Sequence, residues 1–283
     1  MGQRQGSRGV LSLKSMLHRL LPEQVKRSWW YLTDRQWRAT YCDSRRKISS
    51  LQNAQRRAFA QLCQQTNDTV VAGPFRGLRY VVSVNRGTFT QKLLGTYEKE
   101  LWSVIEEIVS RAYPLVVDVG AAEGFYVNGL AMRLPQARIV AFEAQTECHS
   151  RLLDIARSNN LAERIEVHGI CQPGDLRNTL ASDVPKLLIC DVEGAEEELL
   201  DPAKVPALRE CDILVEVHDC IRPGIGVELK RRFGATHSIR IIASTPRTLD
   251  DLPVGIELEP ELALAAMDEC RGVDMEWFWM TNR

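Results

Sequence analysis

From Thr96 onward, short apolar runs alternate with segments whose apolar residues recur every three or four positions. The runs have the length and composition of buried strands, and the segments between them have the periodicity of helices. Strands that alternate with helices build a parallel sheet covered on both faces, which binds ligands at the carboxyl ends of its strands. An α/β fold is therefore expected. The five strands are LVVDVG (115–120), RIVAFEA (138–144), RIEVHGI (164–170), KLLICDV (186–192) and DILVEVH (212–218).

Two more strands are expected near the end of the chain, in IRIIAS (239–244) and MEWFWM (275–280). Helical periodicity is clearest in YEKELWSVIEEIV (97–109), FYVNGLAMRL (125–134) and ECHSRLLDIARSNNL (147–161). Together these elements predict a Rossmann-like, doubly wound and mostly parallel sheet of seven strands.

The segment before this alternation has a different character. Residues 1–66 carry 13 Lys and Arg against 3 acidic residues, about +10, which leaves about −11 for the rest of a chain with a net charge of −1. Residues 10–32 place Leu and Met on one side of a helix and basic residues on the other. Two interpretations stay open. The helix binds peripherally to a membrane surface, or it packs on its own domain or on a second subunit. Residues 44–65 predict a second, Arg-rich helix.

Between these parts, TVVAGPFRGLRYVVSV (69–84) predicts a strand pair with a turn near residues 73–77. The expected organisation is a basic helical extension (1–66), a short strand pair or cap (67–94) and a main domain (95–283). The eight cysteines are scattered and form no CxxC pair, so a reducing cytoplasm fits better than a disulfide framework. No apolar run reaches the roughly 18 residues that span a bilayer. Membrane contact would therefore be peripheral, at the inner face and through the basic N-terminal helix.

A loop of small residues follows the first strand. Asp118, Gly120, Ala122 and Gly124 alternate with other residues in VVDVGAAEGFY. A dinucleotide-binding loop would read G-x-G-x-x-G, but Ala122 and Phe125 stand at its second and third glycines. The pattern acid-x-Gly-x-small-x-Gly is similar to that of class I S-adenosylmethionine-dependent methyltransferases. We therefore expect Asp118, Gly120, Ala122 and Gly124 to bind that cofactor.

Two further residues are expected beside the cofactor. Glu143 ends the second strand, where a carboxylate can accept hydrogen bonds from both hydroxyls of an adenosine ribose. Nicotinamide sites share this feature, so Glu143 indicates adenosine without choosing between the two cofactors. Cys171 follows the third strand, where the topology places an adenine ring; a plain turn is the alternative reading.

Acidic residues and a histidine follow the fourth and fifth strands. Asp191 and Glu193 come after KLLIC, and Glu216 and His218 lie at the end of DILVEVH. Because the carboxyl ends of parallel strands meet at one edge, we expect these side chains to border the methyl acceptor. A His or a carboxylate there can remove the proton of a hydroxyl that attacks the sulfonium methyl group. Alternatively, the four residues hold a divalent cation that orients the hydroxyl.

Three glutamates follow at a predicted helix start. Acidic side chains in a first turn complement the positive end of the helix, by roughly a few tenths of a kcal/mol each. We therefore interpret Glu196, Glu197 and Glu198 as helix-start residues that lie outside the site.

Four segments, VVDVGAAEGFY, IVAFEAQTE, LLICDVEGAEEELL and ILVEVHD, resemble the FkbM family of methyltransferases. GTYEKELW (95–102) resembles the helix that precedes the core of that family. The resemblance covers roughly residues 95–219, with DVEGAE (191–196) as its most specific part. It departs from the family at Glu123, where Asn is usual, and around Cys190. It implies that S-adenosylmethionine is bound by Asp118, Gly120, Ala122, Gly124 and Glu143, and that Asp191 and Glu193 border the acceptor.

The expected activity is methylation of a hydroxyl on a small molecule, or on a sugar or lipid-linked precursor. The basic N-terminal region prompts the alternative of a nucleic-acid methyltransferase. Against it, the fourth strand ends in DVEG rather than in an Asp/Asn-Pro-Pro-aromatic motif, and no Pro-Cys nucleophile is present. A nicotinamide oxidoreductase fits Glu143 but not the loop. A membrane-associated module that keeps the fold without catalysis is the non-enzymatic alternative.

Overall fold

The computed structural model describes residues 35–81, 88–271 and 274–283, with side chains from residue 49 onward. The amphipathic helix expected at 10–32 lies outside the described residues. The chain forms two compact units, the first ending at Asn53 and the second comprising Ala54–Arg283. The Arg-rich segment is one helix, α3 (Arg35–Thr66), which begins earlier than predicted. The second half of α3 belongs to the second unit, which also contains the sheet.

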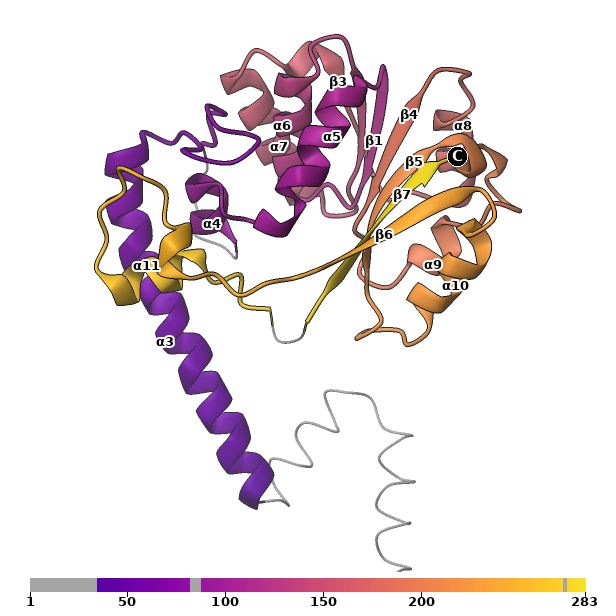
Figure 1. The fold of residues 1–283 in the computed structure, drawn as a ribbon. Helices are drawn as coiled ribbons and strands as arrows, with labels where there is room; N and C mark the ends of the chain where they lie inside the picture. Colours follow the sequence, from indigo (N-terminus) through magenta and orange to yellow (C-terminus); the bar gives the residue numbers. More distant parts are fainter. Residues whose placement is uncertain (1–34, 82–87, 272–273) are drawn as a thin grey trace, which may run out of the picture. The chain divides into compact units, whose positions relative to one another are not determined.

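Seven strands form one sheet in the order β3-β2-β1-β4-β5-β7-β6 (Figure 1). β1 to β5 are parallel, and β7 runs antiparallel between β5 and β6. This confirms the predicted Rossmann-like, doubly wound and mostly parallel sheet of seven strands. The strands are β1 (Leu115–Val119), β2 (Arg138–Phe142), β3 (Ile165–His168), β4 (Lys186–Cys190), β5 (Asp212–Val217), β6 (His237–Ala243) and β7 (Glu276–Asn282).

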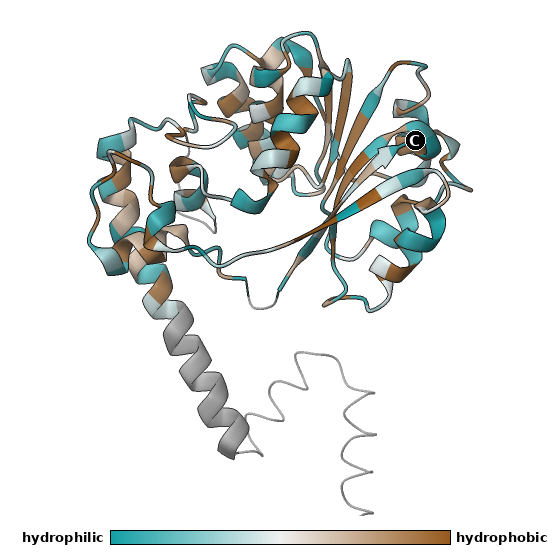
Figure 2. Cartoon of the chain, viewed as in Figure 1, coloured by the Kyte–Doolittle hydropathy of each residue, from teal (hydrophilic) through white to brown (hydrophobic). Residues whose placement is uncertain are grey.

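Helices cover both faces of the sheet because successive strand residues point to opposite sides. Val116 packs in one apolar cluster with α5, α6 and α7, whereas Val117 packs in a second cluster with α8, α9 and α10. Figure 2 shows the central strands as mostly hydrophobic, with many hydrophilic residues on the flanking helices. The helices are α5 (Trp102–Arg111), α6 (Phe125–Arg133), α7 (Thr146–Ser158), α8 (Pro173–Thr179), α9 (Glu196–Leu199) and α10 (Ile225–Phe233).

Within residues 69–81, the described part of the expected strand pair, there is one antiparallel bridge, between Thr69 and Arg79. The chain turns at the predicted place, through Gly73 and Gly77 with positive φ. Residues 69–81 are held in place by packing against α6. The Phe75 ring lies so close to Gly129 of α6 that a Cβ added to this glycine would be 2.4 Å from it. The short helix α4 (Phe89–Leu94) follows.

The chain between β6 and β7 contains α11 (Pro260–Met267), which periodicity did not predict. Leu262 and Ala266 of α11 pack against Ala58 and Leu62 of α3 and against Leu94 of α4. The cap and this insertion therefore share one apolar cluster. The cysteines with described side chains are all free thiols, as expected. Among the described residues, no helix combines the length and the apolar character needed to cross a membrane.

Candidate functional site

The loop between β1 and α6 passes directly over the end of β4. Gly120 has a φ of 89°, in the region that glycine adopts most easily. A Cβ added there would lie 1.6 Å from the carbonyl oxygen of Asp191. The N–H groups of Gly120 and Ala121 donate to the Phe142 carbonyl at 2.9 and 3.1 Å. A side chain at residue 120 cannot fit, so this glycine sets the distance between the loop and β4.

The carboxylate of Glu143 is fixed by the backbone around it. Its Oε2 accepts a hydrogen bond from the Ala122 N–H at 2.7 Å, and its Oε1 accepts one from the Gln145 N–H at 2.6 Å. Glu143 is 7% exposed. Each carboxylate oxygen has a further lone pair, so the group can still accept hydrogen bonds from two ligand hydroxyls.

A cavity of about 350 Å³ opens where the ends of four parallel strands meet. This volume lies within the usual range for small-molecule sites, about 300 to 1,000 Å³. The wall includes both acidic residues that follow β4 and three of the six residues expected to bind the cofactor. These wall residues are Gly120, Glu143, Cys171, Asp191 and Glu193.

The other three expected cofactor residues shape the loop and do not line the cavity. Asp118 is buried within β1, and Ala122 lies in the left-handed region with a φ of 46°. Gly124 begins α6 and lies against Leu152, since a Cβ there would be 2.4 Å from its Cγ. Burial and the charge of Glu143 raise the pKa of Asp118 to about 7.

The residues expected at the ends of β4 and β5 come together around one imidazole. The His218 Nε2 lies 3.6 Å from an Asp191 oxygen, 3.5 Å from a Glu193 oxygen and 3.6 Å from a Glu216 oxygen. His218 is 3% exposed, whereas the Glu193 side chain is 76% exposed. The four predicted side chains therefore form one cluster that is open to solvent on the Glu193 side.

The three glutamates were interpreted as helix-start residues outside the site, and for Glu196 this interpretation is wrong. Its side chain is fully buried, and its Oε1 accepts a hydrogen bond from the His218 Nδ1. The same oxygen accepts the Gly194 N–H at 3.2 Å. Glu197 instead pairs with Arg222 at 2.8 Å, whereas Glu198 is exposed and lines the cavity. Glu196 therefore belongs to the cluster around His218 and Glu198 to the cavity wall, and only Glu197 lies outside both.

An arginine that the sequence did not predict borders the cluster, with a side chain that is 20% exposed. Arg271 pairs with Glu98, with Glu216 and, through its Nε at 2.8 Å, with Glu269. Glu98 precedes the short 3-10 helix η1 (Lys99–Leu101) and has a φ of 45°. The sequence gives little sign of this network, because Arg271 and Glu98 are 173 residues apart and each lies among other charged residues.

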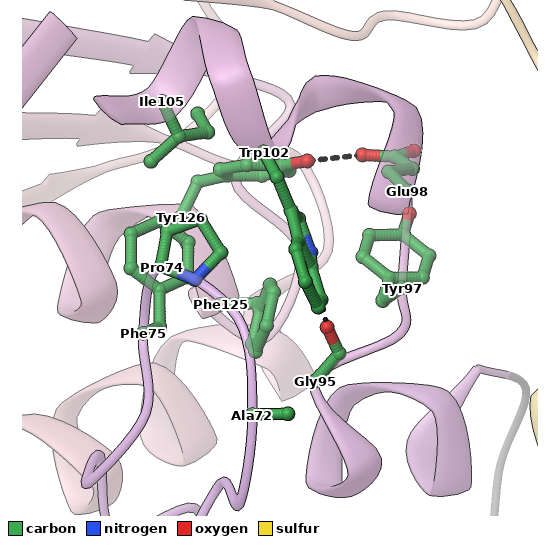
Figure 3. Close-up of a pocket in the computed structure, with 10 residues that line it drawn as sticks. All are labelled: Ala72, Pro74, Phe75, Gly95, Tyr97, Glu98, Trp102, Ile105, Phe125 and Tyr126. Atoms are coloured by element: carbon green, nitrogen blue, oxygen red, sulfur yellow. Dashed lines mark hydrogen bonds between the residues drawn. The ribbon is translucent and has the colours of Figure 1, made fainter. Parts of the chain in front are cut away.

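Aromatic side chains fill the space behind Glu98, as Figure 3 shows. The Tyr126 hydroxyl donates a hydrogen bond to Glu98, and the Trp102 indole N–H donates to the Gly95 carbonyl at 3.2 Å. The remaining void is only about 10 Å³. It holds one water molecule at most. This region is therefore a packed support for Glu98 and does not itself bind a ligand.

A second ion pair links the cap to the glycine loop. The carboxylate of Glu123 accepts hydrogen bonds from the Tyr80 hydroxyl at 2.8 Å and from the Lys92 ammonium group. Burial of Glu123 opposes its charged form, but Lys92 and Tyr80 outweigh this and lower its pKa to about 2. Glu123 thus anchors the loop to the cap and does not face the cavity.

The protonation of the cluster around His218 is shifted by its surroundings. Burial raises the pKa of Asp191, and the charges of Glu216 and Glu98 raise it further. Burial of His218 disfavours its charged form, but the acidic neighbours, Glu196 first, raise its pKa to about 9. At neutral pH the cluster therefore retains protons that isolated carboxylates and imidazoles would have lost.

Comparisons with known proteins found methyltransferases among the solved structures. The O-methyltransferase TomG of Streptomyces achromogenes, involved in tomaymycin synthesis and bound to S-adenosylmethionine, is 17% identical over 68% of this chain and 82% of its own, with a TM-score of 0.39. An O-methyltransferase of Bacillus cereus in complex with S-adenosylhomocysteine is 16% identical over 58% of this chain and 76% of its own, with a TM-score of 0.39. The precorrin-6y C5,15-methyltransferase of Geobacter metallireducens is 13% identical over 64% of this chain and 88% of its own, with a TM-score of 0.40.

Neither a protein-family model nor a curated protein matches the chain. At the identities and TM-scores of the three solved structures, the similarity identifies neither an activity nor a substrate. The roles of the residues in the site therefore follow from their geometry and chemistry.

The contact between Gly120 and β4 predicts the effect of a single added methyl group. In Gly120→Ala the added Cβ would clash with the Asp191 carbonyl oxygen, at 1.6 Å, so the loop has to move away from β4. We expect a fall of roughly 2 to 4 kcal/mol in the free energy of unfolding, measured by urea denaturation, because overpacking and a positive φ both add strain. The matched control is Gly169→Ala after β3, where no atom lies within 4 Å of the added Cβ. Equal stability of the two variants would contradict this account of the loop.

The raised pKa of Asp118 predicts a pH-dependent difference in stability. An Asp with a pKa of 3.8 when unfolded and about 7 when folded stabilises the protein below pH 3.8 and loses that contribution as the pH rises to 7. Asp118→Asn keeps the shape without the charge. Above pH 7 the variant is expected to be more stable than the wild type by roughly 2 to 4 kcal/mol.

The difference between the two proteins should shrink between pH 7 and pH 4 in urea denaturation. The control Asp183→Asn changes an exposed acid and should show no such trend. A constant difference between the wild type and Asp118→Asn across this range would show that Asp118 is ionised in the folded protein.

Proposed function

We propose that this protein is an S-adenosylmethionine-dependent methyltransferase that methylates a hydroxyl on a small molecule, or on a sugar or lipid-linked precursor. The observation that carries the proposal is the cavity of about 350 Å³ between the glycine loop, Glu143, Cys171 and Asp191. It combines a fixed carboxylate suited to a ribose with an acidic, histidine-containing cluster at one end. An adenosine-containing cofactor and an acceptor can therefore meet at Asp191.

The hydrogen bonds of the loop favour S-adenosylmethionine over a nicotinamide dinucleotide. A dinucleotide site presents free backbone N–H groups to a pyrophosphate. Here the N–H groups of Gly120 and Ala121 donate to Phe142, that of Ala122 donates to Glu143, and that of Gly124 donates to Ala121. The loop therefore has few donors left for a diphosphate. S-adenosylmethionine has no diphosphate, and its ammonium and sulfonium charges outnumber its one carboxylate.

The proposed reaction needs one proton acceptor. The hydroxyl oxygen of the acceptor forms a bond to the methyl carbon as the sulfonium–methyl bond breaks, which gives a methyl ether, S-adenosylhomocysteine and a proton. Asp191 lines the cavity, and His218 lies 3.6 Å from it. This geometry supports a role for the two residues, in their deprotonated forms, in taking the proton or in anchoring a cation that lowers the pKa of the hydroxyl.

Membership of the FkbM family is a finer proposal. It rests on the four segments that resemble this family, which include both the loop and the DVEGAE stretch. The burial of Glu196, the last residue of that stretch, against His218 supports it, because it gives the final glutamate a role in the site. The acceptor is not specified by this resemblance.

Binding of the product cofactor tests the adenosine assignment. Calorimetric titration should show that the protein binds S-adenosylhomocysteine and does not bind NAD. Glu143→Ala should weaken S-adenosylhomocysteine binding at least tenfold, because two charge-assisted hydrogen bonds are lost. Glu163→Ala, an exposed glutamate beside β3, is the control and should bind like the wild type. Full affinity in Glu143→Ala, or binding of NAD alone, would refute the assignment.

Methyl transfer from labelled S-adenosylmethionine to a panel of hydroxylated acceptors tests the reaction. With any acceptor that is methylated, Asp191→Asn is expected to lower turnover by about 100-fold or more, because the proton acceptor or cation anchor is removed. The control is Asp250→Asn, an exposed acid between β6 and β7. Unchanged turnover of Asp191→Asn in the presence of a chelator would exclude both roles of this residue.

A further inference from the structure

We propose that Asp191, Glu193 and His218 bind one divalent transition-metal cation, and that Glu196 positions the imidazole for it. This inference deepens the proposed function, because the ion would orient the hydroxyl of the methyl acceptor and make it more acidic. Binding of the ion itself can be measured without cofactor or acceptor.

The spacing of the donor atoms fits a metal ion better than it fits hydrogen bonds. One donor atom from each of Asp191, Glu193 and His218 lies within 4.8 Å of the other two. The His218 Nε2 is 3.6 Å from Asp191 and 3.5 Å from Glu193. Metal–ligand bonds of about 2.1 Å separate neighbouring ligand atoms by about 3.0 Å in an octahedron and about 3.4 Å in a tetrahedron. The distances from the His218 Nε2 to the two carboxylates would therefore have to shorten by about 0.6 Å at most.

One buried donor atom at this point has no hydrogen-bond partner among the described residues. The Asp191 Oδ1 is buried and accepts no hydrogen bond, and its contact with the His218 Nε2 is an ion pair at 3.6 Å. That Nε2 belongs to a side chain that is 97% buried and faces the carboxylates. A buried polar atom without a hydrogen bond is costly. A bound cation would satisfy the Asp191 oxygen and take the Nε2 as a second ligand.

Glu196 provides the support that metal-binding histidines usually have. Its carboxylate accepts the hydrogen bond of the His218 Nδ1–H, which leaves the Nε2 facing the cluster, where a cation would replace its proton. Glu196 is fully buried, so water does not compete for this hydrogen bond. Glu196 is a positioning residue in this arrangement, since its contact is to the imidazole.

The backbone at Glu193 is strained in a way that favours the site. Glu193 has a φ of 50°, in the left-handed region that residues other than glycine rarely adopt. This conformation brings its carboxylate back toward His218, although its side chain is 76% exposed. Strain of this kind is typical of ligand-binding residues. The exposure of Glu193 gives an ion access from solvent.

The donor set selects the class of ion. Two carboxylates with one imidazole suit first-row cations such as Mn²⁺ or Zn²⁺, whereas Ca²⁺ prefers oxygen ligands alone. Glu216 lies 3.6 Å from the His218 Nε2, but its other oxygen is held by Arg271. We therefore assign Glu216 to the surroundings of the ion.

A Mn²⁺ titration of the chelator-treated full-length chain tests the proposal. Electron paramagnetic resonance measures free Mn²⁺, and calorimetry measures the heat of binding. We expect one Mn²⁺ per chain and a higher unfolding temperature when it is bound. Glu193→Gln, at an exposed position that tolerates substitution, should weaken Mn²⁺ binding at least tenfold. Glu196→Gln should weaken it by about 10- to 100-fold.

The matched control is Glu197→Gln, the same substitution one residue along, where the side chain pairs with Arg222 instead. It should bind Mn²⁺ like the wild type. The proposal is overturned if the wild type binds no Mn²⁺, or if folded Glu193→Gln and His218→Ala bind it with wild-type affinity. A wild type that binds S-adenosylhomocysteine but not Mn²⁺ refutes the metal site alone. Binding of Mn²⁺ without S-adenosylhomocysteine refutes the proposed function alone.

Discussion

The close approach of Gly120 to the carbonyl oxygen of Asp191 is the constraint on which the site depends. It follows from the parallel pairing of β1 with β4, which places Val119 beside Cys190 and carries both chains to the same edge. A loop with a side chain at residue 120 would stand away from β4. The N–H of Ala122 could then no longer reach Glu143 at the end of β2. Because Gly120 has no Cβ, the ends of β1, β2 and β4 can lie around one cavity.

The two sides of this edge are built by different physical means. On the side formed by the loop, the backbone donors are satisfied within the protein, and the Glu143 carboxylate is fixed with lone pairs left to accept hydrogen bonds. The side formed by β4 and β5 gathers buried acids around His218, with Arg271 as a cation in contact with two of them, Glu98 and Glu216. Buried charge in such excess is costly unless it is paired, protonated or bound to a cation. The shifted pKa values of Asp191 and His218 reflect the second of these outcomes.

The sequence predicted what depends on local pattern. All seven strands were located, because runs such as KLLIC are short, apolar and bounded by polar residues. The meeting of Asp191, Glu193, Glu216 and His218 followed from strand direction alone. Glu196 was misread, because periodicity does not tell which of three adjacent glutamates turns inward when α9 is only four residues long. Arg271 was not found, because its contacts with Glu98 and Glu216 join parts of the chain far apart in sequence.

The antiparallel strand β7 also has a consequence for how the protein is made. It lies between β5 and β6, so neither of these strands pairs with the other in the finished sheet. As the chain leaves the ribosome, β5 can join β4 at once, but its other edge stays open until β7 has been synthesised. For that period β6 has no partner in the sheet. Such long-range pairing slows folding and leaves an unpaired strand edge exposed to other chains. Chaperone demand and aggregation during synthesis should therefore be governed by this late strand rather than by the half of the sheet that contains β1 to β4.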